Sequence, residues 1–403
     1  MLTRSSRTRA RPVAAALATA AAGALLLSSC ARFDDSAAEQ TYQPAPELTP
    51  QAGPQPELPE AGGGGPRPGG PGPSAEPVPP PQGCTDFDPA VVQTCLDTVS
   101  TVAALPGDGS TPGALAGERR SGRVLQVAPD TDPVELATLP VDASGDGGLT
   151  GLALSPSYGE DQLVFAYLTT PEDNRVVRFA QGQEPKPVLT GIPRGATGNG
   201  GALASDGKGA LLVATGNAGD PAAAADPASL AGKVLRIDPA GQPAEGNPTA
   251  GSAVYASGLH APGGLCASQD GSRLWVTDRA PDKDAIFRVQ PGAPLTAPAW
   301  TWPDRPGVAG CSDWSDLVMV ATSTAGNMQN LPVAQDGSIT GRPTVSADGE
   351  NGPTYGKLAG MDMVTPELGV AGTINKDGGQ PVSSDDRVVL FVRQQGGPGN
   401  GKD

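Results

Sequence analysis

The sequence predicts an all-β protein, a six-bladed β-propeller that follows an export signal with a lipobox and a disordered Pro/Gly-rich linker. Three observations carry this prediction. A two-strand pattern occurs six times at nearly even spacing, and near residue 83 a Pro/Gly-rich stretch gives way to short β-rich runs. Gly (56) and Pro (44) are abundant, while aromatic residues make up only 4%. Such a composition favours short strands joined by turns over long helices.

The first 29 residues are typical of a secretory signal. Four arginines precede an apolar run from Val13 to Leu27, and the segment ends in Leu27-Ser28-Ser29-Cys30. The run is too short for a comfortable membrane span, and small residues directly before a cysteine resemble the bacterial lipobox. We expect cleavage before Cys30, lipidation of Cys30, and an exported protein anchored to the outer face of the cell membrane. The alternative is an ordinary signal peptide in which Cys30 is incidental.

The next segment, residues 30–82, combines the lipidated cysteine with a linker. Its stretch AGGGGPRPGGPGPSAEPVPPP cannot bury a core, so we expect it to stay disordered and to hold the folded part away from the lipid surface. Residues 83–393 form the predicted propeller, and residues 394–403 a loose tail.

The repeats define the blades. Each consists of a small or apolar strand, a turn and a second apolar strand, and the six copies start at Val102, Gly151, Gly201, Gly264, Gly310 and Gly360. The intervals are 49, 50, 63, 46 and 50 residues, and a period of roughly 40–50 residues with several strands per repeat is typical of a β-propeller. Later strands such as RVLQVAP and KVLRIDP alternate apolar and charged residues, as half-buried strands do. The alternatives are a β-sandwich or a β-helix, and the even spacing together with the recurring D-G turns favours the propeller over both.

Charge and cysteine content narrow the function further. The formal net charge is −16, and no basic stripe lies outside the signal, so nucleic-acid binding is excluded as a function class. Beyond Cys30 the chain has four cysteines, an even number that predicts two disulfides in an exported protein. We expect the pairs Cys84–Cys95 and Cys266–Cys311, the second between consecutive repeats. A four-cysteine metal site is the alternative, but no C-x-x-C pair is present.

Several stretches together resemble a known family. GDGGLTGLALSPSY, NGGALASDGKGALLVATGNAGD with LAGKVLRIDPAG, YASGLHAPGGL with LWVTDRAPDKDAIFRV, and GKLAGM are similar in order and spacing to motifs of the soluble glucose/sorbosone dehydrogenases. Within that family the chain most resembles actinobacterial lipoproteins of the LppZ type. The resemblance covers about residues 96–393, and it implies a six-bladed propeller that uses pyrroloquinoline quinone (PQQ) and calcium to oxidise sugars.

The resemblance also implies site residues, and here the chain departs from the family. The family's catalytic histidine stands directly before an N-G-G motif, where this chain has Gly198. The chain's single histidine, His260, occupies the place of an arginine that contacts the quinone, and Ala359 replaces a second arginine while Lys357 keeps one positive charge nearby. His260 has three interpretations: a relocated base, a part of a different ligand pocket, or a structural loop residue.

The remaining candidates are contacts for cofactor and metal. Asp146, Asn199, His260 and Lys357 are the candidate PQQ contacts, and Asp278 and Asp284 stand where the family has acidic residues near calcium. Carboxylates are suitable ligands for a hard cation, although ordinary solvated turn residues would produce the same pattern.

Two functions remain after these observations. The first is a cell-envelope lipoprotein with a catalytically degenerate dehydrogenase propeller, which acts as a scaffold or binds a small sugar or envelope glycan. The second is an active PQQ-dependent sugar dehydrogenase with a rearranged site. We expect a monomer whose contact with the membrane is the lipid anchor.

Overall fold

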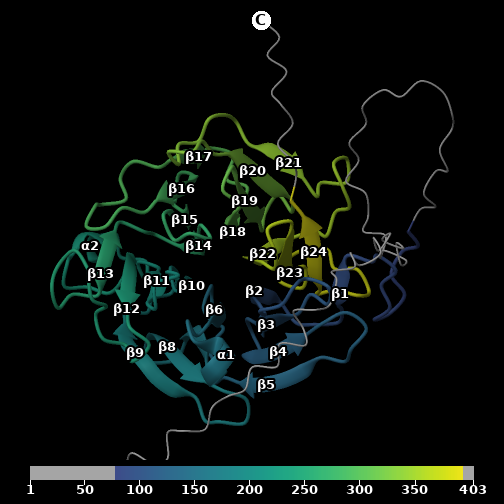
Figure 1. Cartoon of the computed structure of the whole chain (residues 1–403), viewed down its shortest axis with the longest axis horizontal. Coiled ribbons are helices and arrows are strands. Elements are labelled where there is room, and N and C mark those ends of the chain that lie inside the picture. The colour runs from purple at the N-terminus through teal and green to yellow at the C-terminus, as the bar shows by residue number, and fades with distance from the viewer. Residues whose placement is uncertain (1–77, 394–403) are drawn as a thin grey trace, which may run out of the picture. The chain divides into compact units, whose positions relative to one another are not determined.

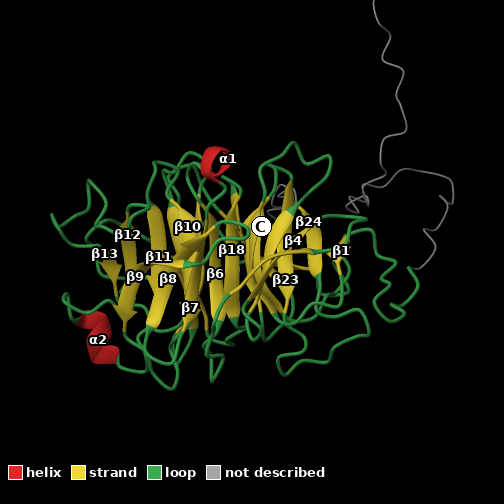
Figure 2. Cartoon of the chain, turned by 90° about the horizontal axis from the view of Figure 1, so that it is seen from below, coloured by secondary structure: helices red, strands yellow, loops and turns green. Residues whose placement is uncertain are grey.

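The computed structural model describes residues 78–393. The predicted signal peptide, Cys30, most of the linker and the tail at 394–403 lie outside the described residues. Within the described part, six four-stranded antiparallel sheets are arranged around a common axis, as Figure 1 shows from above and Figure 2 from the side. The predicted all-β fold with six blades is confirmed.

Each blade runs from an inner strand at the axis to an outer strand at the rim. Blade 1 contains β2 (Val99–Ala104), β3 (Ala114–Glu118), β4 (Arg123–Val127) and β5 (Val134–Thr138). Blade 2 contains β6 (Leu149–Leu154), β7 (Val164–Thr169), β8 (Asn174–Phe179) and β9 (Lys186–Ile192). Blade 3 contains β10 (Gly201–Ser205), β11 (Leu211–Thr215), β12 (Lys233–Ile237) and β13 (Val254–Ser257). Blade 4 contains β14 (Pro262–Ala267), β15 (Leu274–Arg279), β16 (Asp284–Arg288) and β17 (Trp300–Trp302). Blade 5 contains β18 (Val308–Asp313), β19 (Leu317–Thr322), β20 (Met328–Pro332) and β21 (Thr344–Ser346). Blade 6 contains β22 (Leu358–Met363), β23 (Leu368–Thr373), β24 (Val388–Val392) and β1 (Val91–Gln93). Two short helices, α1 (Tyr158–Asp161) and α2 (Pro221–Ala225), lie in loops.

The residues that start the six repeats all lie in inner strands. A Cβ atom at Gly264 would come within 2.5 Å of the Ala309 carbonyl oxygen, and one at Gly360 within 2.5 Å of the Thr101 Cα atom. These glycines are required because neighbouring inner strands approach backbone to backbone around the axis. The cavity that the inner strands line measures only about 30 Å³, so the centre of the propeller has room for about one water molecule.

The ring closes through a strand from the start of the domain. The three-residue strand β1 pairs antiparallel with β24, with Val91 opposite Val389, and forms the outer edge of the last blade. The buried Arg387 side chain adds ion pairs to Asp86 at 3.2 Å and to Asp385 at 2.9 Å. The last blade is therefore built from both ends of the domain.

Both predicted disulfides are present. Cys84 and Cys95 are joined with their Cα atoms 5.5 Å apart, next to the ring closure. Cys266 of β14 and Cys311 of β18 are joined with their Cα atoms 5.7 Å apart, so this bond ties blade 4 to blade 5.

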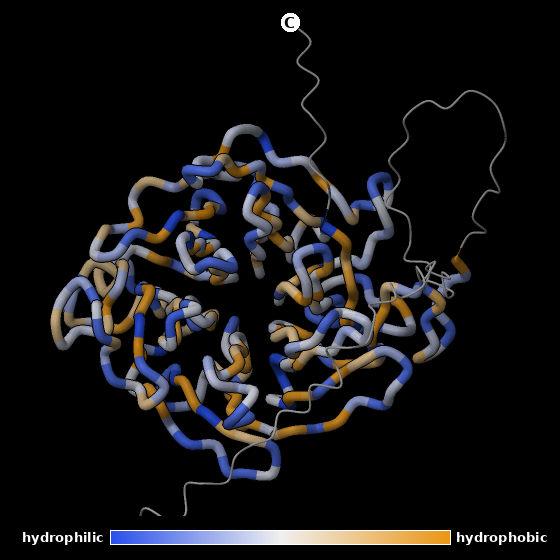
Figure 3. The backbone as a smooth tube through the Cα atoms, viewed as in Figure 1, coloured by the Kyte–Doolittle hydropathy of each residue, from blue (hydrophilic) through white to orange (hydrophobic). Residues whose placement is uncertain are grey.

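The core lies between the blades rather than in one central mass. Apolar residues from facing sheets pack together, for example Val234 with Val276 between blades 3 and 4, and Trp275 with Val320 between blades 4 and 5. Figure 3 accordingly shows hydrophobic segments in each of the six blades. Among the described residues, no helix is long and apolar enough to cross a membrane.

Candidate functional site

All six predicted cofactor and metal residues lie on one side of the propeller. We call this side the N face, because it is the edge at which the inner strands begin; the opposite edge, where they end, is the C face. Asp146, Asn199, His260 and Lys357 precede inner strands, Asp278 lies near the end of β15, and Asp284 begins β16. Because the strands are antiparallel, these positions all belong to the same edge of their sheets.

Gly198, at the position that the resemblance assigns to a base, lies in a crowded turn. Its φ is +71°, and its N–H donates to Asp146 Oδ2 at 2.7 Å. A Cβ atom here would come within 2.8 Å of Asn217 Oδ1, 2.9 Å of the Gly219 nitrogen and 3.0 Å of the Ala218 nitrogen. A side chain at 198 would therefore require both a strained backbone conformation and movement of the next loop.

Asp146 and Asn199 hold this turn in place. Asp146 Oδ1 accepts from the Asn199 N–H at 3.2 Å and from Asn199 Nδ2 at 3.0 Å. Asn199 is 1% exposed, and its amide also bonds both the N–H and the carbonyl of Gly195. These bonds join the loop before β6 to the loop before β10, and they occupy two of the four side chains that the sequence assigned to cofactor binding.

His260 has a different environment. Its Nδ1 lies 3.1 Å from Asp278 Oδ2, and the Asp278 carboxylate also accepts the backbone N–H groups of His260 at 2.9 Å and Ala261 at 2.8 Å. The Asp278 side chain is 2% exposed and that of His260 36%. The hydrogen bond from Asp278 raises the pKa of the His260 imidazole above its usual value. Within residues 78–393, Nε2 of His260 makes no hydrogen bond, so one ring nitrogen is held by a buried carboxylate and the other faces outward.

The Gly198 and His260 loops are neighbours. The Asn217 N–H donates to the His260 carbonyl at 2.8 Å, and the Ala218 N–H donates to the Gly198 carbonyl at 2.9 Å. A single short segment after β11 thus contacts both loops. The only histidine of the chain therefore lies beside the turn at Gly198.

The two carboxylates predicted to bind metal are occupied by backbone donors. Asp284 Oδ2 accepts the N–H groups of Gly307 at 2.6 Å and Val308 at 3.0 Å, as Asp278 accepts those of His260 and Ala261. In the part of the chain that the structure describes, no group of three or more His, Cys, Asp or Glu side chains is arranged to hold a metal ion. Calcium binding stays a prediction that rests on the resemblance.

The N face also carries cations, of which the sequence had indicated only Lys357. Lys357 is half-buried, and its Nζ makes a 3.3 Å contact to the Asp377 carbonyl. Arg279 ends β15, is half-buried, and makes no side-chain hydrogen bond or ion pair to any residue from 78 to 393; its Nε is buried without a partner. Arg119, on the same face, is held by Asp377 at 2.9 Å and by loop carbonyls. Arg279 follows Asp278 directly in the sequence, but nothing in the pattern showed that its guanidinium would have no partner.

Comparison with known proteins decides the family. A family profile described as "Glucose / Sorbosone dehydrogenase" matches residues 101–305. The chain belongs to the glucose/sorbosone dehydrogenase family. The predicted resemblance is thereby confirmed at the level of the family.

Solved structures agree with this assignment. The chain is similar to the PQQ-bound form of an aldose sugar dehydrogenase from Streptomyces coelicolor, with 30% identity, a TM-score of 0.68, and coverage of 75% of this chain and 96% of that one. It is also similar to a putative oxidoreductase (glucose dehydrogenase) from Thermus thermophilus, with 28% identity, a TM-score of 0.67, and coverage of 75% and 98%. Among curated proteins, the aldose sugar dehydrogenase YliI of Escherichia coli is 27% identical over 179 residues, which are 40% of this chain and 48% of that protein. The chain therefore matches about half the length of this curated relative.

Two features characterise the N face of this glucose/sorbosone dehydrogenase propeller. The turn at Gly198 has no room for a side chain, and its neighbouring polar groups hold backbone. The loop at His260 instead presents an imidazole that Asp278 orients. The arrangement offers cations and one oriented imidazole nitrogen to a ligand.

Proposed function

We propose that the chain is an exported, lipid-anchored protein of the cell envelope whose dehydrogenase propeller binds a small sugar or envelope glycan without oxidising it. The observation that carries this proposal is the turn at Gly198. It has a positive φ, a backbone hydrogen bond to Asp146 and no space for a Cβ atom.

The chemistry explains why this turn matters. Oxidation of a sugar hydroxyl to a carbonyl moves a hydride from carbon to an acceptor and a proton from oxygen to a base. A positioned base within hydrogen-bond reach contributes about 10²–10⁴ in rate. A glycine supplies no such group, and substitution cannot restore one here without moving the segment 217–219.

The residues present fit an anionic cofactor better than they fit its metal. PQQ, when bound, supplies an electrophilic quinone that accepts a hydride, and it carries carboxylates that cations hold. Arg279, which has no partner in residues 78–393, and Lys357 are the groups that would hold those carboxylates. Asp278 and Asp284 already accept backbone N–H groups, so we assign no step to calcium.

A second candidate function is supported by the His260–Asp278 pair. A histidine whose Nδ1 is held by a buried carboxylate keeps its tautomer and orientation, and its Nε2 is then available as a base. His260 also lies beside the Gly198 turn, since Asn217 contacts its backbone. In this alternative the chain is an active PQQ-dependent sugar dehydrogenase in which His260 takes the proton.

One experiment separates the two functions. The full chain is incubated with PQQ and calcium, and dye reduction is followed with glucose, other aldoses and sorbosone, with the aldose sugar dehydrogenase of Streptomyces coelicolor as positive control. We expect no turnover above background, with PQQ absorbance retained after desalting if Arg279 and Lys357 hold the cofactor. Turnover that disappears in His260→Gln would overturn the first proposal in favour of the second.

The anchor has a test of its own. The arginine-rich start, the apolar run and Leu27-Ser28-Ser29-Cys30 support lipidation. We expect Cys30→Ala to remove the lipid mass and to shift the protein from the membrane fraction to the soluble exported fraction. Unchanged mass and unchanged detergent partitioning in this variant would rule out the anchor.

A further inference from the structure

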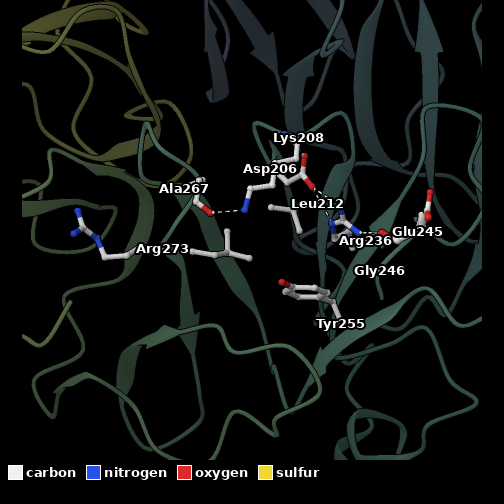
Figure 4. A pocket seen from close by; sticks show the side chains of 11 residues that line it. Asp206, Lys208, Leu212, Arg236, Glu245, Gly246, Tyr255, Ala267 and Arg273 are labelled. Atoms are coloured by element: carbon white, nitrogen blue, oxygen red, sulfur yellow. Dashed lines mark hydrogen bonds and ion pairs between the residues drawn. The ribbon is translucent and has the colours of Figure 1, made fainter. Parts of the chain in front are cut away.

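A second cavity lies on the C face, between blades 3 and 4. Its volume is about 240 Å³, and it is bounded by the β10–β11 and β14–β15 hairpins and by residues of β12 and β13. Figure 4 shows the side chains that converge on it. Nothing in the proposed function uses this cavity.

The cavity is separated from the site on the N face by the length of a strand. Strand β14 begins at Pro262, two residues after His260, and ends at Ala267, which lines the cavity. Six residues of extended strand span about 20 Å. A ligand in this cavity therefore does not contact His260 or the Gly198 turn.

One side of the cavity is apolar and ends in an aromatic ring. Leu212, Leu274 and Ala267 contribute aliphatic surface, and the ring of Tyr255 lies beside Leu212 (Figure 4). Tyr255 is half-buried, and its hydroxyl makes no hydrogen bond to the residues that the structure describes. A tyrosine in this setting offers a flat apolar face together with an unused polar group.

The rim carries charges of both signs, and most of them are already paired. Asp206 holds Arg236 at 2.7 Å, and Arg236 also donates to the Glu245 carbonyl at 2.7 Å. Arg273 is bound to Asp313 at 2.7 Å. Two groups remain available to a ligand: Lys208 Nζ, whose only contact in the described chain is the Gly271 carbonyl at 3.4 Å, and the Glu245 carboxylate, which has no partner there.

We propose that this cavity binds one neutral, polyhydroxylated ring, as in a monosaccharide or the end of a glycan chain. The volume of about 240 Å³ lies below the roughly 300–1,000 Å³ of pockets that hold drug-sized ligands, which suits a single ring. The apolar wall with Tyr255 fits the C–H face of such a ring, while Lys208, Glu245 and the Tyr255 hydroxyl supply donors and acceptors to its hydroxyls. The available charges, one positive and one negative, favour a neutral ligand over an ion of either sign.

The test uses methyl α-D-glucopyranoside, whose blocked anomeric carbon separates binding from sugar oxidation. Binding to the full chain is measured by saturation-transfer NMR, and charged analogues (the methyl glucuronide and glucosamine) are compared. We expect the neutral glycoside to bind best. Tyr255→Ala should weaken its binding tenfold or more, Tyr255→Phe and Lys208→Ala several-fold, and Val134→Ala, at an exposed site in blade 1, not at all.

The controls keep the outcome decisive. Circular dichroism establishes that the Tyr255 variants are folded, and Lys208→Ala tests the cavity even if Tyr255→Ala is unstable. Absence of saturation transfer to the glycoside, stronger binding of the glucuronide, or binding that is unchanged in both Tyr255→Ala and Lys208→Ala would each overturn the proposal. Dye reduction is measured separately, so failure here is distinguishable from failure of the proposed function.

Discussion

The loop before β10 and the loop before β14 occupy equivalent places in neighbouring blades, but they use their polar side chains differently. In the first, Asp146 accepts three hydrogen bonds from Gly198 and Asn199, and no side chain reaches outward from residue 198. In the second, Asp278 accepts two backbone N–H groups and also holds the imidazole of His260.

The difference concerns side chains and leaves the architecture of the two loops the same. Each loop is held by a carboxylate that accepts backbone N–H groups. The conformation of each loop therefore does not depend on the side chains of residues 198 and 260. A glycine at residue 198 is therefore compatible with an intact fold, and function depends on the site rather than on the fold.

The first prediction concerns the disulfide that joins blade 4 to blade 5. Blade 4, which follows His260, is tied to blade 5 by Cys266–Cys311, a bond that closes a loop of 45 residues. Replacing both cysteines by alanine should lower the free energy of unfolding by about 4 kcal/mol, because the unfolded chain regains the entropy of that loop. Urea unfolding under oxidising conditions measures this.

The matched control is the pair Cys84 and Cys95, which closes a loop of only 11 residues. Its removal should cost about 3 kcal/mol by the same reasoning. An equal or larger loss from the 84–95 pair would contradict the account, and it would show that the ring closure matters more than the tie between blades 4 and 5.

The second prediction tests the crowding at Gly198. Gly198→Ala should destabilise the protein by about 2–4 kcal/mol, from a strained positive φ and from contact with the loop at 217–219. Gly182→Ala is the control: its φ of +72° is similar, but nothing lies within 4 Å of the added Cβ atom, so it should cost only about 1–2 kcal/mol. Equal losses in the two variants would mean that the turn at 198 has room for a side chain.

The third prediction removes the carboxylate that holds the Gly198 turn. Asp146→Ala leaves the N–H groups of Gly198 and Asn199 without their acceptor and should cost about 2 kcal/mol. Asp108→Ala, in an exposed turn, serves as control and should cost much less. If both variants unfold at the same denaturant concentration, Asp146 does not hold the turn.

The fourth prediction concerns the second loop and is the smallest in energy. The hydrogen bond to Asp278 stabilises the protonated His260, so the imidazole pKa in the folded protein should lie above the value of about 6.5 found in unfolded chains. The resulting stabilisation is complete below pH 6.5 and is lost as the pH rises through the folded pKa. Because the chain has a single histidine, one NMR resonance reports the titration directly.

Asp278→Asn provides the comparison for that titration. It should lower the pKa of His260 towards the unfolded value, because the neutral amide no longer stabilises the imidazolium. An unchanged titration in this variant would mean that Asp278 serves only the backbone, and the two loops would then be alike.

The repeats could be predicted from the sequence because the packing of the inner strands requires the glycines that mark them. Residues such as Gly264 and Gly360 lie where inner strands meet backbone to backbone, and that requirement recurs in successive blades. The pairing of β1 with β24 was not predicted, because a three-residue strand carries little pattern and its partner lies almost 300 residues away. The disulfides followed from even cysteine number and from the register of consecutive repeats.

The site was less accessible to sequence reasoning. Asp278 lies 3.1 Å from the Nδ1 atom of His260, 18 residues earlier in the chain, a contact that the sequence did not predict, while its role beside a metal stays a prediction. That contact depends on how β15 folds back beside the start of β14, which periodicity does not reveal. The partnerless guanidinium of Arg279 and the cavity between blades 3 and 4 likewise depend on side-chain packing between loops.

We propose that the N face binds a sugar without oxidising it, because residue 198 is a glycine and supplies no base. The most direct test is a single-turnover measurement, in which glucose is mixed with the full chain preincubated with PQQ and calcium and the cofactor absorbance is followed. We predict no glucose-dependent change in that absorbance over many minutes. A rapid glucose-dependent reduction of the cofactor, abolished in His260→Gln, would contradict the account and would assign the base to His260.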